Sequence, residues 1–273
     1  MTIDQITESA SFLQSKVTVV PQVGIVLGTG LNDLANHIQN KMIIDYTDIP
    51  HFPASTVTFH KGQLLFGTIA GVPVVAMQGR FHYYEGYSMQ QITFPVRVMK
   101  ELGITYLLLS NAAGGMHPHF KKGDLIITED HINLLPDNPL RGLGDAFGNR
   151  FVDMSQPYDV QLQRRVHQAM EEEGIPVKKG VYVSVMGPNL ETKAEYRWLR
   201  STGADMVGMS TVPEVIVANQ LGIKCAAVSV ITDECDPDHL QPVNIAKIIE
   251  VAGMADKKLS AVFKRVIGFL AGC

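Results

Sequence analysis

The sequence lacks the features that mark membrane-spanning, secreted and nucleic-acid-binding chains. No apolar run approaches the roughly 18 residues that suggest a membrane span. The first 15 residues contain Asp4 and Glu8 and predict an amphipathic helix, without the basic start and apolar run of a signal peptide. With 23 basic and 27 acidic residues, the formal net charge is −4. No overall attraction to nucleic acid or to an anionic membrane is therefore expected, and an anionic substrate requires a local basic site.

Paired cysteines are also missing. Cys225, Cys235 and Cys273 are odd in number and show no CxxC spacing, so neither a disulfide framework nor a structural zinc site is expected. The acidic segment from Asp233 to His239 lacks the regular spacing of a calcium loop or a zincin helix, and no metal site is predicted. A reducing cytoplasm is the expected location.

What the chain does have is material for a core, since 46% of its 273 residues are hydrophobic and only 18% are charged. Its short apolar runs lack period-two alternation, which is typical of strands covered on both faces. The predicted strands are Val23–Leu27, Val72–Met77, Tyr106–Ser110, Leu125–Thr128, Val181–Val185 and Cys225–Ile231. The predicted helices are Leu31–Gln39, Met89–Leu102, Val160–Glu173, Thr192–Ser201, Val212–Leu221 and about Val243–Leu270.

This alternation of strands and helices predicts a single α/β domain over residues 1–273, with a largely parallel sheet flanked by helices. No internal repeat or low-complexity linker divides the chain. The segment Leu134–Ser155 is rich in Pro, Gly, Asp and Asn and is expected to be a long surface loop of the functional or mobile kind.

A glycine-rich segment, Gly28-Thr-Gly-Leu31, follows the first predicted strand and opens a predicted helix. Glycines permit close backbone approach, and the N–H groups of a helix N-terminus favour an anion. A phosphate site and a plain tight turn are equally compatible with this motif. Asp33 stands where a dinucleotide fingerprint needs its third glycine, which argues against a nicotinamide dehydrogenase.

The segment Gly79–Gly86 follows another buried strand. In an extended chain Arg80, His82 and Tyr84 project to one side. The planar fork of arginine suits phosphate oxygens, histidine adds a hydrogen bond, and tyrosine covers a sugar face. The alternative is a polar loop with an incidental arginine.

Three later segments place polar or small residues beside strand ends, and each has a structural alternative. The small residues of Asn111–Gly115 leave room for a ligand or make a tight turn. Glu191 either caps a helix or faces a site. Ser210 or Thr211 is a candidate N-cap, with Glu214 as its capping-box partner.

In their order along the chain, these motifs closely resemble those of the trimeric purine nucleoside phosphorylases. The resemblance rests on Gly28–Leu31, Gly79–Gly86, Thr93–Arg97, Asn111–Gly115, Asp130–Asn133, Asn138–Gly142, Gly187–Thr192 and Gly208–Val215. It spans nearly the whole chain, and the segments around Arg80 and Met209 are shared with the methylthioadenosine phosphorylases. It implies a mixed-sheet α/β fold, a homotrimer, and no cofactor beyond inorganic phosphate as co-substrate.

The resemblance also implies roles for individual residues. It places phosphate on Thr29, His60, Arg80, His82, the Ala112 backbone and Ser210, with His60 gating the site. It places ribose against Tyr84, Met209, Ile245 and the Phe151 of a neighbouring subunit. It places the base against Tyr182, Leu190, Glu191, Val207, Met209 and Asp233. Catalytic contributions are expected from His82, Glu191 and Asp233.

The implied reaction is phosphorolysis of nucleosides such as inosine and guanosine, with phosphate attacking C1′ from the face opposite the base. The products are the free base and an α-(deoxy)ribose 1-phosphate. Negative charge then develops on the purine, and hydrogen bonds at its edge stabilise that charge. A non-catalytic nucleoside-binding protein is the rival class, but binding alone does not require the phosphate set of Arg80, His82 and Ser210.

Several positions depart from the pattern of the 6-oxopurine enzymes. Asp233 stands where most of them have Asn, Ile245 aligns with their ribose-contacting His, and Thr29 replaces a common Ser. All three favour the alternative of a methylthioadenosine or adenosine phosphorylase. Glu191, however, is the 6-oxopurine signature. Two carboxylates that flank one base are expected to share a proton.

Overall fold

The computed structural model describes residues 1–56 and 61–272. A nine-stranded sheet runs through it in the order β2-β3-β4-β1-β5-β8-β7-β6-β9. Five of its nine strand pairings within the described residues are parallel and four are antiparallel, so the sheet is mixed with a narrow parallel majority. The strands are β1 Val23–Leu27, β2 Gln39–Asp45, β3 Gln63–Ile69, β4 Val72–Gln78, β5 Tyr106–Gly115, β6 Leu125–Asn133, β7 Lys178–Ser184, β8 Met206–Gly208 and β9 Lys224–Glu234.

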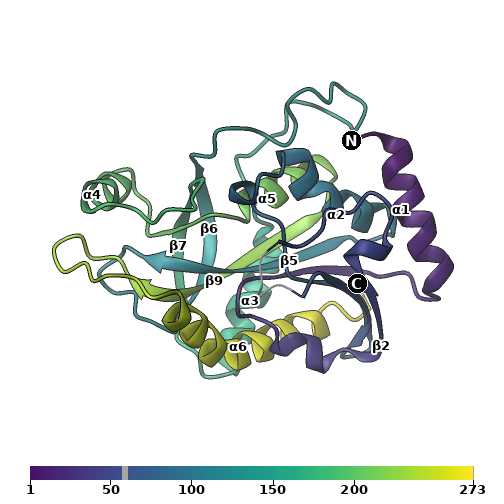
Figure 1. Cartoon of the computed structure of the whole chain (residues 1–273). Coiled ribbons are helices and arrows are strands. Elements are labelled where there is room, and N and C mark those ends of the chain that lie inside the picture. Colours follow the sequence, from purple (N-terminus) through teal and green to yellow (C-terminus); the bar gives the residue numbers. More distant parts are fainter. Residues whose placement is uncertain (57–60, 273) are drawn as a thin grey trace.

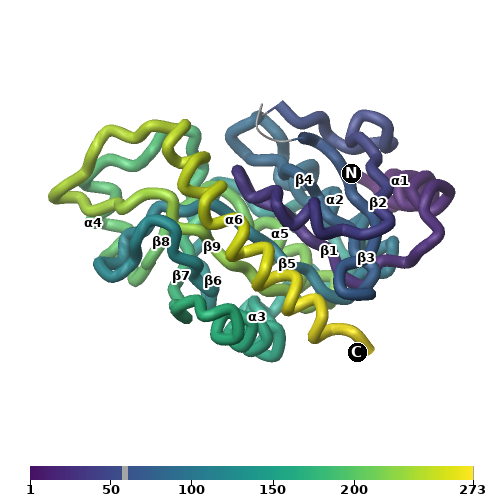
Figure 2. Tube along the Cα trace, turned by 90° about the horizontal axis from the view of Figure 1, so that it is seen from below, coloured from purple at the N-terminus to yellow at the C-terminus, as the bar shows by residue number. Residues whose placement is uncertain are grey.

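Helices cover both faces of the sheet (Figures 1 and 2). The α-helices are α1 Ile3–Lys16, α2 Met89–Glu101, α3 Val160–Glu172, α4 Lys193–Ser201, α5 Val212–Gln220 and α6 Ile245–Gly268. Along β1, Ile25 packs into the core under α3 and α6, whereas Val26 packs into the core under α1, α2 and α5. Successive side chains of a strand point to opposite faces, which explains why this strand is apolar throughout.

One half of the sheet closes on itself. Strand β9 pairs with both β5 and β6, while β8 joins β5 to β7, so that β5, β8, β7, β6 and β9 form a ring. Strands β4, β1, β5 and β9 are parallel neighbours. Their carboxyl ends therefore meet at one edge of the sheet, which is where open α/β sheets bind ligands.

Some elements differ from the sequence prediction. The helix predicted over Leu31–Gln39 is wrong, because only a short 3₁₀ helix, η1 Asp33–His37, forms there before the chain enters β2. Strands β2, β3 and β8 were not predicted. In β2 only Ile44 is buried, and β8 spans three residues, too few for a periodic signal. The long loop was predicted correctly, since Leu134–Ser155 contains no helix or strand.

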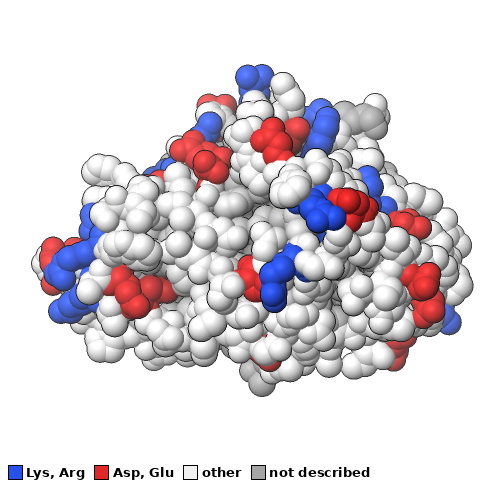
Figure 3. All heavy atoms as spheres, turned by 90° about the horizontal axis from the view of Figure 1, so that it is seen from above, with Lys and Arg blue, Asp and Glu red and all other residues white. Residues whose placement is uncertain are grey.

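The surface carries no patch of one charge on the face seen from above, where acidic and basic side chains are interspersed over a mostly uncharged area (Figure 3). Within the described ranges, no helix has both the length and the apolar character needed to cross a bilayer. Cys225 and Cys235 are buried free thiols, and Cys273 lies outside the described residues.

Candidate active site

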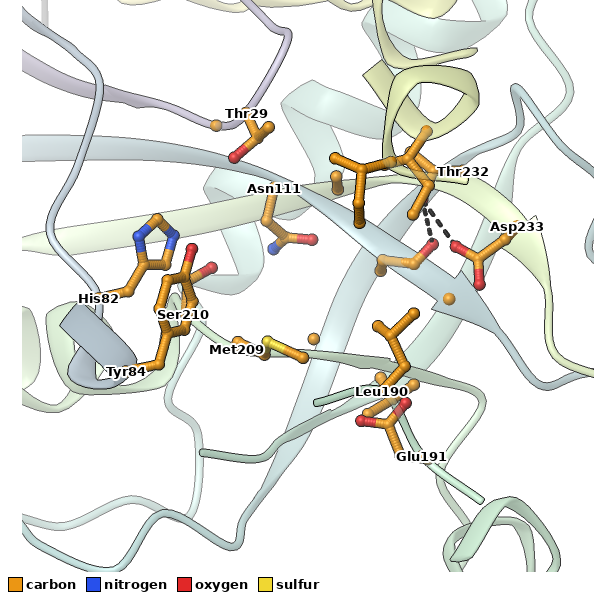
Figure 4. Close-up of a pocket in the computed structure, with 18 of the residues that line it drawn as sticks. Thr29, His82, Tyr84, Asn111, Leu190, Glu191, Met209, Ser210, Thr232 and Asp233 are labelled. Atoms are coloured by element: carbon orange, nitrogen blue, oxygen red, sulfur yellow. Dashed lines mark hydrogen bonds between the residues drawn. The ribbon is translucent and has the colours of Figure 1, made fainter. Parts of the chain in front are cut away.

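A cavity lies at the carboxyl edge shared by β1, β4, β5 and β9, and Figure 4 shows its lining. The tertiary structure brings to it most of the residues singled out in the sequence. They are Thr29, Arg80, His82, Tyr84, Ala112, Leu190, Glu191, Val207, Met209, Ser210, Asp233 and Ile245. The lining also includes Asn111, Tyr196 and Thr232, for which the sequence predicted no role.

Two other predicted residues, Tyr182 and Phe151, do not line this cavity, and a third cannot be placed. Tyr182 is fully buried behind the wall, where its hydroxyl accepts a hydrogen bond from the Ser210 N–H at 3.3 Å. Phe151 is 82% exposed and borders a separate hollow together with Arg141. His60 lies outside the described residues.

Arg80 is the buried cation at one end of the cavity. Its Nη1 donates to the Ser110 carbonyl at 2.9 Å and to the Ser210 hydroxyl at 3.0 Å. Its Nε lies 3.1 Å from Oε1 of Glu214. The capping-box prediction for Glu214 is wrong, because no side chain caps the N-terminus of α5. The carboxylate compensates a buried charge instead.

The segment that presents Ser210 to Arg80 is a strained turn. Thr211 has φ 72° and ψ −50°, and the Val212 N–H donates to the Ser210 carbonyl at 2.8 Å, which together define a γ-turn of the rare kind. Such a conformation in a β-branched residue costs about 1–3 kcal/mol. The Thr211 hydroxyl accepts from Asn111 Nδ2 at 2.9 Å. The turn thus places two neighbouring hydroxyls beside one guanidinium.

His82 is held by a carboxylate that the sequence analysis missed. Its Nδ1 and its backbone N–H lie 2.9 and 2.8 Å from Oε1 of Glu85, and its ring stacks on Tyr84 with centroids 4.7 Å apart. Burial lowers the pKa of His82 below its ordinary value near 6.5, although the Glu85 carboxylate opposes the shift. The ring is therefore neutral at neutral pH, with Nδ1–H directed to Glu85. The spacing of three residues between His82 and Glu85 is the sequence feature that could have predicted this pair.

The Gly28–Leu31 segment reaches the cavity through close backbone packing. A Cβ atom on Gly28 would lie 2.8 Å from both the Asn111 Cα and the Ser110 carbonyl oxygen, so only glycine fits there. From α6, the buried Asp256 carboxylate accepts the N–H groups of Asn32 and Asp33, each at 2.6 Å. The predicted helix N-terminus is absent here, and a side chain of α6 positions the segment instead.

Two carboxylates lie at the opposite end of the cavity from His82 and Ser210 (Figure 4). Asp233 accepts hydrogen bonds from the Thr232 hydroxyl at 2.9 Å and from the Cys235 thiol at 3.1 Å. Burial raises the pKa of Glu191, and the neighbouring charge of Asp233 acts in the same direction. The capping prediction for Glu191 is wrong, because Thr192 is the N-cap of α4.

The cavity therefore has three chemically distinct parts. One end offers cationic and hydroxyl donors that suit an oxyanion, and the other offers acceptors that suit the N–H groups of a flat polar ring. Between them lies Met209 (Figure 4), and Tyr84 and Val207 also belong to the lining, so the cavity suits a molecule with an apolar face. The described residues contain no cluster of three or more side chains that suits a metal ion.

The chain is similar to known proteins over nearly its whole length. Residues 22–268 match the family model described as the phosphorylase superfamily. The chain is 48% identical to Purine nucleoside phosphorylase 1 of Bacillus subtilis over 265 residues, which is 97% of this chain and 96% of the relative.

Solved structures from Schistosoma mansoni are also similar. Isoform 2 of its purine nucleoside phosphorylase, in complex with cytosine and ribose-1-phosphate, is 40% identical with a TM-score of 0.94 and covers 98% of this chain and 97% of its own. A purine nucleoside phosphorylase from the same organism in complex with inosine is 41% identical with a TM-score of 0.92, over 98% and 96% of the two chains.

Proposed function

The chain belongs to the purine nucleoside phosphorylases of the phosphorylase superfamily, and from this membership we propose how its cavity cleaves inosine, guanosine and their deoxy counterparts with inorganic phosphate. The products are the free base and an α-(deoxy)ribose 1-phosphate. One observation carries the proposal: a single cavity holds Arg80, His82 and Ser210 at one end and Glu191 and Asp233 at the other. An anion and a purine are thereby held on opposite sides of a sugar.

Phosphate binds at the Arg80 end. The Arg80 guanidinium, the Ser210 and Thr29 hydroxyls and the Ala112 N–H donate to its oxygens. The neutral His82 ring meets a phosphate hydroxyl through Nε2, because Nδ1–H is directed to Glu85. Phosphate held in this way stabilises the oxocarbenium character of the ribose and then attacks C1′. Each preorganised donor contributes on the order of 3 kcal/mol.

The base binds at the carboxylate end. An ionised Glu191 accepts N1–H of a 6-oxopurine, while Asp233 faces the 6-substituent and N7. Hydrogen bonds there stabilise the negative charge that develops on the leaving purine. Leu190, Val207 and Met209 cover the base, and Tyr182 supports that wall from behind through Ser210. The reaction requires no cofactor, since phosphate itself is the nucleophile.

A broader substrate range is the second candidate. Ile245 lines the ribose part of the cavity and makes it more apolar, and Asp233 accepts from a 6-amino group. We therefore expect some turnover of adenosine and of 5′-modified nucleosides such as methylthioadenosine. A phosphorolysis panel of inosine, guanosine, adenosine and methylthioadenosine tests this order. Activity on methylthioadenosine alone would contradict the assignment of inosine and guanosine as the primary substrates.

The active assembly is a homotrimer in the cytoplasm that serves purine salvage. Phe151 is exposed on a long loop and supplies an aromatic side chain to the ribose of a neighbouring subunit. Complementation tests this arrangement: Phe151→Ala and Arg80→Met are each weakly active, but their co-folded mixture regains activity at sites that combine an intact Arg80 with a neighbour's Phe151. A mixture no more active than its components would exclude a shared site.

The decisive experiment is the release of hypoxanthine from inosine with and without phosphate. Release that depends on phosphate and yields a ribose phosphate supports the proposal. Binding of inosine without release would indicate a nucleoside-binding protein. A thermal shift with NAD would favour a dehydrogenase.

A further inference from the structure

We propose that Asn111 and Thr211 fix the direction of the Ser210 hydroxyl, so that this group donates its proton toward the anion end of the cavity. Asn111 and Thr211 are positioning residues in this scheme, because they act through Ser210. The inference rests on the proposed function, in which phosphate binds beside Arg80. It adds the reason why this end of the cavity presents a proton, and no lone pair, to an oxyanion.

The three side chains are connected by hydrogen bonds beside the Arg80 guanidinium. Asn111 Nδ2 donates to the Thr211 hydroxyl at 2.9 Å, and the hydroxyls of Thr211 and Ser210 lie 3.2 Å apart. Nη1 of Arg80 donates to the Ser210 hydroxyl at 3.0 Å and to the Thr211 hydroxyl at 3.3 Å. Asn111 and Ser210 line the cavity, whereas Thr211 is completely buried and does not belong to the lining.

The proton of the Thr211 hydroxyl has a single acceptor among the described residues. The partners of the Thr211 oxygen are Asn111 Nδ2, Arg80 Nη1 and the Ser210 hydroxyl. An amide NH₂ group and a guanidinium only donate hydrogen bonds. The Thr211 oxygen therefore accepts from Asn111 and Arg80, and its own proton is donated to the Ser210 oxygen.

The same count determines where the Ser210 proton points. A hydroxyl has two lone pairs and one proton, and the lone pairs of Ser210 accept from Arg80 Nη1 and from Thr211. The Ser210 proton is then directed to the cavity, at the end that holds His82 (Figure 4). An oxyanion bound there gains a hydrogen bond, whereas a reversed chain would turn a lone pair toward it and repel it.

The backbone around Ser210 is held in place by other contacts. Its carbonyl accepts from the Val212 N–H at 2.8 Å and from the Ser184 hydroxyl at 3.2 Å, and its N–H donates to the Tyr182 hydroxyl at 3.3 Å. The γ-turn at Thr211, with φ 72°, keeps the two hydroxyls side by side. These contacts place the Ser210 side chain but leave the direction of its proton to the neighbouring hydroxyl.

Binding of inorganic phosphate, measured by calorimetry without nucleoside, tests the inference directly. Thr211→Val keeps the branched shape and removes the hydroxyl, so the Kd for phosphate should rise about tenfold, as expected when a hydrogen bond to a charged group is weakened. Thr211→Ser keeps the hydroxyl and should keep the wild-type Kd. Asn111→Leu should raise the Kd by a smaller factor, since Arg80 still donates to Thr211 in that variant.

A Ser210→Ala background separates positioning from a general structural role. Ser210→Ala alone should raise the phosphate Kd about tenfold, because it removes the donor itself. If Thr211 and Asn111 act through Ser210, adding Thr211→Val or Asn111→Leu to Ser210→Ala should change the Kd no further. A structural role predicts instead that the effects add and that the KM for inosine rises as well, and that result would overturn the inference.

A matched control lies elsewhere in the sheet. The Thr128 hydroxyl is also fully buried and lies 3.4 Å from a serine hydroxyl, that of Ser229, and neither residue lines the cavity. Thr128→Val should therefore bind phosphate as the wild type does. If Thr211→Val does not fold, as judged by circular dichroism, Asn111→Leu tests the same connection from its other end.

The phosphate Kd also separates the inference from the proposed function, because it requires no turnover. If no protein in the set cleaves inosine but the Kd values shift as described, the proposed function fails and the positioning role stands. If inosine is cleaved but Thr211→Val and Asn111→Leu bind phosphate as tightly as the wild type, the positioning role fails alone. A wild-type protein that binds no phosphate would contradict both.

Discussion

Nε of Arg80 lies 3.1 Å from Oε1 of Glu214, and both side chains are almost completely buried, with exposed fractions of 2% and 4%. The cation at the anion-binding end of the cavity thus has a compensating charge within the protein. Anion binding at this end depends on how the donors of Arg80 are aimed as well as on charge. The Glu214 carboxylate and the Ser110 carbonyl orient the Arg80 guanidinium.

Neutralising Glu214 should destabilise the fold. Glu214→Gln leaves the buried Arg80 without its countercharge, and breaking a buried pair in this way costs about 3–5 kcal/mol in the free energy of unfolding. Urea unfolding measures this loss. Glu172→Gln is the matched control, because Glu172 pairs with Arg265 at 2.8 Å on the surface and its loss should cost less than about 1 kcal/mol. Equal urea midpoints for the two variants would contradict the assignment of Glu214 as the countercharge of Arg80.

Removing Asp256 should weaken phosphate binding from a distance. Asp256→Ala leaves the N–H groups of Asn32 and Asp33 without their acceptor, so the segment that carries Thr29 loses its position. We expect the KM for phosphate to rise about tenfold, because a hydrogen bond to a charged group is worth about 1.5–3 kcal/mol. Asp159→Ala removes a similar acceptor at the N-terminus of α3 and should lower stability with no effect on that KM.

Replacing the carboxylate of Asp233 by an amide should increase the preference for 6-oxopurines over 6-aminopurines. The variant Asp233→Asn introduces an N–H donor that reaches O6 of a 6-oxopurine. The ratio of kcat/KM for inosine over adenosine should rise about tenfold or more, because 6-oxopurines gain a donor while 6-aminopurines lose a charged acceptor. Steady-state kinetics on the two nucleosides measures this ratio. An unchanged ratio would remove Asp233 from base recognition.

The pH dependence of inosine cleavage should reflect the pKa of Glu191. Burial raises that pKa above the ordinary value of glutamate, and the charge of Asp233 adds to the effect. The carboxylate that accepts N1–H is ionised above its pKa and protonated below it. The kcat/KM for inosine should therefore fall on the acidic side at a pH above that of an ordinary glutamate, and Glu191→Gln should abolish this limb. A limb that persists in Glu191→Gln would assign it to another group.

The sequence predicted the parts of the fold that depend on local pattern. Strand β1 is apolar at every position because both of its faces are covered, and its bounds were predicted correctly as Val23–Leu27. Strand β2 was missed because its first five residues are exposed and only Ile44 is buried, so its sequence shows neither a buried apolar run nor an alternation of apolar and polar residues. Its existence depends on pairing with β3, which is a contact between segments distant in sequence.

The sequence by itself determined which residues could form the site, since Arg80, His82 and Ser210 already carry the chemistry of an anion and Glu191 and Asp233 that of a polar base. Only the tertiary structure decided which groups hold them. Glu214 reaches Arg80 across 134 positions, a separation for which no local spacing gives a signal. Such pairings arise because the parallel strands end at one edge and bring distant segments together there.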